Sequence, residues 1–292
     1  MITNLYIWRG VVALGYPCLE SFLSTESLAD ECLICVDPTS GDDTMKLAKA
    51  IRRKFPKTTI VEYVWPESSP DGSAIGTASQ FALEQVYEGY VINVQADEVY
   101  PEPLVAHLKA ELPRLMGAGF DGVRLKVLNL EHNAQRFQGG EQWDGVKLGD
   151  VWERGGLHDP VSGLGGAGYN KSMKIAKVSP KIRFSHDAWT FEGCEAWKHI
   201  DFSDEWPIIH LHDFARDHLL AVRRMAADRW WTDQRRFGHY KASADTLEAT
   251  ASEWMKDEKW LQTTSPFDEL LPGVVKPCLG QTTYKVNWEM FE

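Results

Sequence analysis

The sequence predicts an α/β fold in which a mixed, mainly parallel sheet is flanked by helices and followed by a helical C-terminal extension. Three observations predict it. In the first hundred residues, short apolar strand patterns alternate with helix patterns, an order that is typical of parallel strands joined by helical crossovers. After residue 116 this order gives way to shorter strand patterns that indicate antiparallel pieces. Two long helix patterns then follow in the last third of the chain.

The first half of the chain contains four strand patterns and the helices that connect them. Strands are expected at NLYIW (4–8), ECLICVD (31–37), TTIVEYVW (58–65) and YVINVQADE (90–98). Helices are expected at residues 18–29, 45–55 and 73–89. The turn PTSGDDT (38–44) offers Asp and Ser side chains that can cap the second of these helices.

The second half is less regular. We expect a helix at 101–116, a strand at 122–129, a Gly-rich stretch from about 139 to 168, short strands at 171–178 and 182–189, a strand-like run at 206–214, and helices at 215–231 and 242–261. The predicted organisation is one α/β domain over residues 1–216 and a helical extension over 217–292.

Composition excludes some classes of protein. The chain has 31 basic and 42 acidic residues, a net charge of −11, which argues against a general nucleic-acid binder. Five scattered cysteines indicate a reduced, cytoplasmic setting, in a bacterium or a phage-infected host cell. Cys32 and Cys35 lie three apart in one strand pattern, so they are expected on opposite faces as core thiols. No signal peptide or transmembrane segment is expected.

Acidic residues follow two of the predicted parallel strands. Asp37 ends the second strand pattern, and Asp97 and Glu98 end the fourth. Carboxyl ends of parallel strands share one edge of the sheet, which is where such folds bind ligands. Two adjacent acids repel each other unless a cation, a basic partner or solvent balances them. Asp97 is therefore a candidate ligand for Mn²⁺ or Mg²⁺ on nucleotide phosphates; a simple cap at Asp37 and a solvated loop at Asp97 are the alternatives.

Two histidines form a second candidate metal element. His210 and His212 are two residues apart in a strand-like run, so their side chains are expected on the same face. This spacing fits metal ligands, one of which could complete the coordination begun by Asp97. It fits equally a polar pair in the core that is satisfied by backbone groups.

A basic, aromatic segment lies between Arg223 and Lys241. It holds five Arg and one Lys against two Asp, and four aromatic residues are interleaved with them. Such a mixture can bind phosphates and stack on bases or sugars. A helix with aromatic residues in the core and solvated arginines is the alternative. The candidate acceptor-binding residues are Arg223, Arg229, Trp230, Trp231, Arg235 and Arg236.

Residues 18–44, CLESFLSTESLADECLICVDPTSGDDT, followed by YVINVQADEV (90–99), resemble the nucleotide-sugar half of family 2-like glycosyltransferases with the GT-A fold. The resemblance covers about residues 1–216 and implies a catalytic domain there, with a nucleotide-sugar-binding half (1–104) and an acceptor half (105–216). It implies that Asp37 contacts the nucleobase and that Asp97 holds the metal on the sugar-nucleotide diphosphate. Gln95 stands where the Asp-x-Asp motif of the family has its first Asp, and it is expected beside the donor nucleotide. This substitution puts the strength of metal binding in doubt.

Two later segments extend the resemblance. RFSHDAWTF (183–191) resembles an Asp-Ala-x-x-Phe segment of the family, and PIIHLHDFAR (207–216) resembles a His-Tyr-Gly-x-x-Arg segment. The second match needs a one-residue insertion, so it does not distinguish His210 from His212. The first makes Asp187 the expected catalytic base, with Glu192 and Asp213 as substitutes.

The implied function is a metal-dependent, inverting transfer of a sugar from a nucleotide-sugar to a hydroxyl of a saccharide or glycan. One alternative is a phage-type DNA glycosyltransferase acting on a hydroxylated pyrimidine, which only the basic segment favours. Another is a nucleotidyltransferase, which would carry a Gly-rich basic loop after the first strand; here only Arg9 and Gly10 stand there. A third is a non-catalytic nucleotide-sugar-binding protein, which the substitution at Gln95 leaves open.

Overall fold

The computed structural model describes residues 1–66, 74–131, 136–137, 169–184, 188, 190–211, 273 and 285–292. The strands in this part of the chain are β1 (Ile2–Trp8), β2 (Glu31–Val36), β3 (Thr58–Glu62), β4 (Tyr90–Val94), β5 (Glu98–Val99), β6 (Gly122–Glu131), β7 (Arg136–Phe137), β8 (Tyr169–Lys177), β9 (Arg183–Phe184), β10 (Phe191–Glu192), β11 (Trp197–His199) and β12 (Ile208–His210). The helices are α1 (Cys18–Thr25), η1 (Glu26–Leu28), α2 (Thr44–Lys54), α3 (Ala74–Leu83), α4 (Glu102–Gly117), α6 (Phe202–Glu205) and η4 (Trp288–Phe291).

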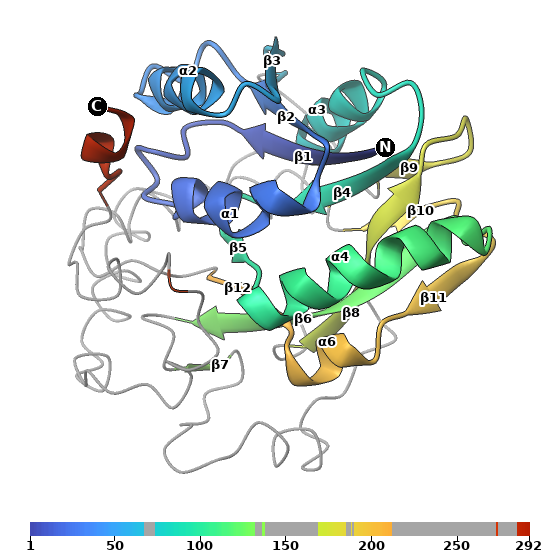
Figure 1. The fold of residues 1–292 in the computed structure, drawn as a ribbon. Coiled ribbons are helices and arrows are strands. Elements are labelled where there is room, and N and C mark those ends of the chain that lie inside the picture. Colours follow the sequence, from blue (N-terminus) through green and yellow to red (C-terminus); the bar gives the residue numbers. More distant parts are fainter. Residues whose placement is uncertain are drawn as a thin grey trace, which may run out of the picture.

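The main sheet has the strand order β3-β2-β1-β4-β8-β6-β12-β5 (Figure 1). The strands β3, β2, β1 and β4 run parallel to one another, and β12 is parallel to β6. The strand β8 is antiparallel to both of its neighbours, β4 and β6. The predicted mixed, mainly parallel sheet is therefore confirmed. The antiparallel piece expected at 171–178 corresponds to β8, which lies in the middle of this sheet.

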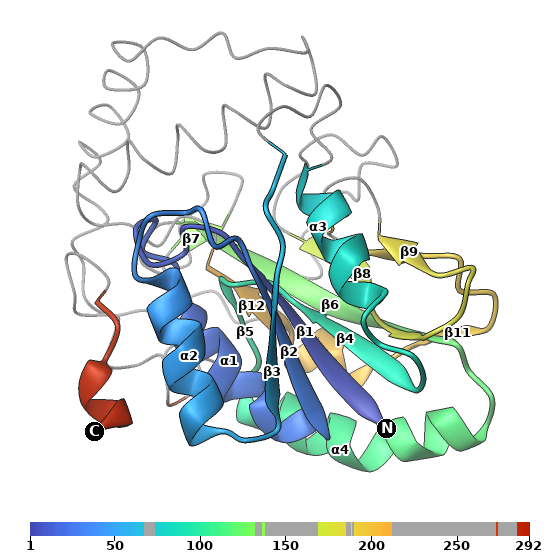
Figure 2. The ribbon, with the colours of Figure 1, turned by 90° about the horizontal axis from the view of Figure 1, so that it is seen from above.

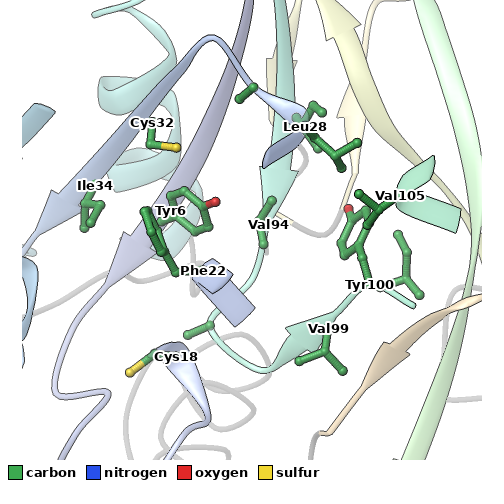
Figure 3. Close-up of a cluster of buried hydrophobic side chains, with 14 of the residues drawn as sticks. Tyr6, Cys18, Phe22, Leu28, Cys32, Ile34, Val94, Val99, Tyr100 and Val105 are labelled. Atoms are coloured by element: carbon green, nitrogen blue, oxygen red, sulfur yellow. The ribbon is translucent and has the colours of Figure 1, made fainter. Parts of the chain in front are cut away.

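Helices cover both faces of the sheet. The helices α1, α2 and α4 lie on one face, and α3 lies on the other (Figure 2). The larger core cluster fills the first face, where the rings of Tyr6 and Phe22 are 5.2 Å apart. Figure 3 shows these rings on one side of Val94, with Val99 and Tyr100 on the other. Val99 and Tyr100 are fully buried, so the chain returns into the core directly after the acidic pair Asp97 and Glu98.

The two cysteines of β2 lie on opposite faces, as predicted. Cys32 belongs to the cluster under α1 and α2, and Cys35 belongs to the cluster under α3. Both are free thiols. Burial raises the pKa of Cys32 to about 11 and that of Cys35 to about 12. Both therefore act as apolar core side chains at neutral pH.

The last residues of the chain pack against the first half. Val286 is buried in the core cluster under α1 and α2, and the ammonium of Lys46 lies 4.3 Å from the ring centroid of Trp288. The helices expected at 215–231 and 242–261 lie outside the described residues, as does the Gly-rich stretch at 139–168. Among the residues that the structure describes, no helix combines the length and the apolar character needed to cross a membrane.

Candidate functional site

The candidate site lies at the edge where β1, β2 and β4 end. The strand β1 lies between β2 and β4 and is parallel to both, so all three have their carboxyl ends at this edge. Asp37 follows β2 directly, and Asp97 lies three residues after the end of β4. Since neighbouring strands are about 4.8 Å apart, the strands that carry the two acids end roughly 10 Å from each other. The predicted common edge is therefore present.

The acidic segment after β4 is a tight turn held from several sides. The backbone N–H of Glu98 donates to the carbonyl of Gln95 at 3.1 Å. The same carbonyl accepts a hydrogen bond from the Ser21 hydroxyl at 2.8 Å. The N–H of Leu211, just after β12, donates to the carbonyl of Asp97 at 2.8 Å. The turn is therefore fixed by α1, by its own backbone and by the end of β12.

The two adjacent acids of this turn have different partners. The Glu98 Oε1 atom lies 2.6 Å from Lys174 Nζ, and both side chains are fully buried. Glu98 Oε2 also accepts a hydrogen bond from the N–H of Gln95 at 3.2 Å. Glu98 is thus balanced by a basic residue of the chain itself and braces the turn from inside. Its neighbour Asp97 keeps 12% of its side chain exposed and is the more accessible of the two acids.

Lys174 reaches Glu98 from an irregular position in β8. Along the β6–β8 ladder, Val123 pairs with Ile175 and Arg124 with Met173, so Lys174 is an extra residue at a β-bulge. A bulge changes the direction of a side chain and often lies beside a functional site. Sequence reasoning missed Lys174, because a Lys between Met and Ile in an alternating strand pattern is typical of the solvent face.

Asp97 and His210 form the candidate metal pair. Their Oδ1 and Nε2 atoms are 3.2 Å apart, and the His210 side chain is 7% exposed. A carboxylate oxygen and an imidazole nitrogen fit Mn²⁺, which accepts both, better than Mg²⁺, which prefers oxygen ligands. Two protein ligands leave coordination positions for phosphate oxygens. His212 lies outside the described residues.

A second cluster of ligand-type side chains lies elsewhere. Within the described part of the chain, His199, Asp201 and Asp204 are the one group of three whose ligand atoms all lie within 4.8 Å of one another. However, Asp204 Oδ1 already lies 3.2 Å from the ammonium of Lys126 and 3.1 Å from His199 Nε2. The cation in this cluster is a lysine of the chain, so we assign no metal site to it.

Asp37 is completely buried and is hydrogen-bonded on both oxygens. Its Oδ1 accepts from the N–H of Thr39 at 2.8 Å and from the Thr39 hydroxyl at 2.6 Å. Its Oδ2 accepts from the N–H of Trp65 at 3.3 Å and pairs with Arg9 Nε at 3.3 Å. The Arg9 guanidinium also lies over the Trp65 ring, 5.6 Å from its centroid. Asp37 thereby ties the end of β1 to the segment after β3.

A third acid, Asp42, joins the loop after β1 to the start of α2. Its carboxylate accepts hydrogen bonds from the N–H of Ala13, the hydroxyl of Ser40 and the hydroxyl of Thr44, each at 2.8 Å. Burial alone would raise the pKa of Asp42, but these hydrogen bonds outweigh it and lower the pKa below the ordinary value of 3.8. Asp42 is therefore one of the residues that fix the loop beside Arg9.

The lowered pKa of Asp42 predicts a pH-dependent contribution to stability. A carboxylate with a depressed pKa stabilises the fold fully above its unfolded pKa and loses this effect as the pH falls through its folded pKa. We expect Asp42→Asn to lower the free energy of unfolding at pH 7, and the difference from wild type to shrink below about pH 4. Urea unfolding between pH 7 and pH 3 measures it. Asp43→Asn, at an exposed neighbour, is the control; a difference that grows at low pH would refute the assignment.

The other predicted site residues are mostly outside the described part of the chain. This applies to Asp187, Asp213 and the six candidate acceptor residues between 223 and 236. Ala188, which follows Asp187, is described: it is buried, has a φ of 56°, and its carbonyl accepts a hydrogen bond from Asn93 Nδ2 at 2.7 Å. Glu192 is exposed in β10.

Comparisons with known proteins place the chain near several solved structures at low similarity. No protein-family model matches the chain, and no curated protein matches it. TarS from S. aureus in complex with UDP-GlcNAc is 13% identical over 94% of this chain and 77% of that chain, with a TM-score of 0.45. The mannosyltransferase PcManGT from Pyrobaculum calidifontis, in complex with GDP-Man and Mn²⁺, is 14% identical over 89% and 71%, with a TM-score of 0.42.

A further structure matches a smaller part of the chain and has a lower TM-score. Glucosyl-3-phosphoglycerate synthase from Mycobacterium tuberculosis, in complex with Mn²⁺, UDP and phosphoglyceric acid, is 19% identical over 61% of this chain and 55% of that chain, with a TM-score of 0.31. Identities below 25% and TM-scores below 0.5 are too low to assign a family or an activity.

Proposed function

We propose that this protein is a metal-dependent glycosyltransferase of the GT-A type, which moves a sugar from a nucleotide-sugar to a hydroxyl of a saccharide acceptor. One observation supports the proposal most. Asp37 and Asp97 end parallel strands at one sheet edge, and Asp97 lies 3.2 Å from His210 while its neighbour Glu98 is neutralised internally. The edge thus holds one partly accessible acid beside an imidazole, the pair of ligand types that a metal–diphosphate site needs.

In the proposed donor site, Asp97 Oδ1 and His210 Nε2 would hold the divalent cation. When bound, this cation supplies Lewis-acid stabilisation of the charge that grows on the departing diphosphate. Gln95 belongs to the same tight turn and is proposed to lie beside the donor nucleotide. The Asp37 end of the edge, on the far side of β1, would take the nucleoside.

We propose Asp187 as the catalytic base of an inverting transfer. Its carboxylate accepts the proton of the acceptor hydroxyl while that oxygen bonds to the anomeric carbon. The bond from this carbon to the diphosphate breaks, and its electron pair leaves with the diphosphate. Two features of the next residue, Ala188, support this role: its carbonyl accepts a hydrogen bond from Asn93 near the end of β4, and its φ is left-handed, a conformation that is enriched at functional sites in non-glycine residues.

Turnover tests the role of Asp187. Asp187→Asn is expected to lower the rate of sugar transfer by about 10²- to 10⁴-fold, because a general base contributes that much, and to leave donor binding unchanged. Release of nucleoside diphosphate from UDP- and GDP-sugars, with Mn²⁺ and a panel of saccharides, measures the rate. Glu192→Gln, which changes an exposed carboxylate, is the matched control. If Glu192→Gln abolishes turnover while Asp187→Asn retains it, Asp187 is not the base.

The same assay separates the other functional classes. A nucleotidyltransferase would release pyrophosphate from a nucleoside triphosphate, and a binding protein would bind the donor without release. A DNA acceptor predicts transfer to hydroxylated duplex DNA with a steep salt dependence. Residues 223–241, the segment that favours DNA, lie outside the described residues.

A further inference from the structure

We propose that Arg9, and not Asp37, is the residue that contacts the donor nucleotide at the nucleoside end of the site. In this proposal Asp37 acts by holding Arg9, and Arg9 donates hydrogen bonds to an oxygen acceptor of the nucleotide. The proposal rests on the function proposed above and assigns one of its recognition groups.

The first step is that Asp37 has no capacity left for a ligand. An ionised carboxylate has about four lone-pair positions. Asp37 uses its two oxygens for four contacts, two with Thr39, one with the N–H of Trp65 and one with Arg9. Its side chain is 0% exposed. A nucleobase could reach this carboxylate only by breaking one of these contacts.

The second step is that Arg9 is accessible where Asp37 is not. Its side chain is 38% exposed, and within the described residues its ion pair with Asp37 is formed through Nε. The two terminal nitrogens of the guanidinium carry the other four N–H groups. Arg9 is the first residue after β1, the strand that lies between the two acid-bearing strands. It therefore stands between the buried Asp37 and the acidic turn that carries Asp97.

The third step is that the guanidinium is held in place before any ligand arrives. Asp37 fixes it through Nε, and the Trp65 ring lies against it at 5.6 Å. Asp37 also binds the backbone N–H of Trp65, so one buried carboxylate orients both the guanidinium and the ring. A guanidinium that is fixed in this way loses little conformational entropy on binding. Because it has only donors, its partner must be an acceptor: a base carbonyl oxygen or a phosphate oxygen.

Calorimetric titration with Mn²⁺ present tests the proposal. The ligands are UDP, GDP, the matching nucleosides uridine and guanosine, and inorganic pyrophosphate. Arg9→Gln is expected to weaken binding of the preferred nucleoside diphosphate roughly tenfold or more. Arg9→Lys is expected to weaken it less, because lysine keeps the positive charge but lacks the planar guanidinium with its paired N–H donors. Arg124→Gln is the matched control, because Arg124 also stacks on a tryptophan, Trp197, at 4.0 Å, but near the start of β6.

The ligand series identifies the acceptor. Weaker binding of both nucleoside and diphosphate to Arg9→Gln places the contact at a base carbonyl. Weaker binding of diphosphate and pyrophosphate, with nucleoside binding unchanged, places it at a phosphate. Unchanged binding of every ligand by a folded Arg9→Gln variant overturns the proposal. If wild type binds no nucleotide, the proposed function itself fails, which is a different outcome.

A double-mutant cycle tests the part assigned to Asp37. If Asp37 acts by holding Arg9, Asp37→Asn weakens binding in the wild-type background and adds little in the Arg9→Gln background. Fully additive losses would show that Asp37 contacts the nucleotide independently, against the proposal. Thermal unfolding of each variant shows whether it is folded. Arg9→Lys leaves a cation beside Asp37, so in this variant the buried carboxylate stays paired.

Discussion

Lys174→Met is expected to lower the free energy of unfolding by about 3–5 kcal/mol, because it leaves a buried carboxylate without its counter-charge. Lys174 and Glu98 are both fully buried and 2.6 Å apart, and Glu98 also braces the turn that carries Asp97. Met fills a similar volume, so the loss is chiefly that of the charge. Urea unfolding at pH 7 measures the change.

An exposed pair with the same separation provides the control. Lys181 Nζ and Glu195 Oε1 are also 2.6 Å apart, but their side chains are 69% and 72% exposed. Lys181→Met is expected to lower the free energy of unfolding far less than Lys174→Met does, because solvent screens such exposed pairs. Lys174→Met combined with Glu98→Gln should recover much of the lost stability, since no unpaired charge then remains buried. Equal effects of Lys174→Met and Lys181→Met would contradict this account of the turn.

Asp97→Asn is expected to weaken metal-dependent nucleotide binding by at least roughly a hundredfold, because it removes the charged protein ligand of the proposed cation. The fold should be little affected. Leu211 donates to the backbone carbonyl of residue 97, which the substitution keeps, and an Asn side chain can still hydrogen-bond to His210. Titration of the preferred nucleoside diphosphate with and without Mn²⁺ measures the effect.

The second carboxylate–histidine pair gives this experiment a close control. Asp204 Oδ1 lies 3.1 Å from His199 Nε2, nearly the separation found between Asp97 and His210. Asp204 belongs to the cluster near α6 that already contains Lys126. Asp204→Asn is expected to leave nucleotide binding unchanged. Equal losses in both variants would show that the effect is not specific to the sheet edge.

The sequence predicted the elements of the first half well, because local patterns determine them. The strand β2 is an apolar run ended by Asp37, and β4 is an apolar run that leads to Asp97. Since alternating strands and helices place parallel strands side by side, the common edge of these acids followed from the pattern. Either His210 or His212 was a candidate to lie beside Asp97, and in the structure it is His210 whose Nε2 lies 3.2 Å from Asp97 Oδ1.

The partners of the acids could not be predicted, because they depend on long-range packing. Lys174 is 76 residues from Glu98 along the chain. A β-bulge turns its side chain inward, and the alternating apolar pattern of the strand does not reveal this bulge. Trp65 reaches Asp37 across 28 residues. In the sequence, Arg9 only indicated that no Gly-rich basic loop follows the first strand. Nothing in the local sequence shows that it pairs with Asp37.

The place of β8 was unpredictable for a similar reason. Its pattern indicated a short antiparallel piece, but its neighbours β4 and β6 precede it by tens of residues, and the segment between β7 and β8 gives no pairing signal. The consecutive side chains of Ile175 and Ala176 are completely buried, one in each of the two core clusters, because both faces of the sheet are covered at this strand. Only the assembled sheet therefore shows that Lys174 lies beside the acidic turn.

We propose that the edge formed by β1, β2 and β4 binds a nucleoside diphosphate through a divalent cation at Asp97. Thermal unfolding of the wild-type protein against UDP, GDP, ADP, CDP and dTDP, with and without Mn²⁺, measures this binding. A ligand at 100 times its dissociation constant should stabilise the fold by about 2.7 kcal/mol. The account predicts that at least one diphosphate does so, and only with Mn²⁺. Absence of stabilisation by every diphosphate in both conditions would contradict it.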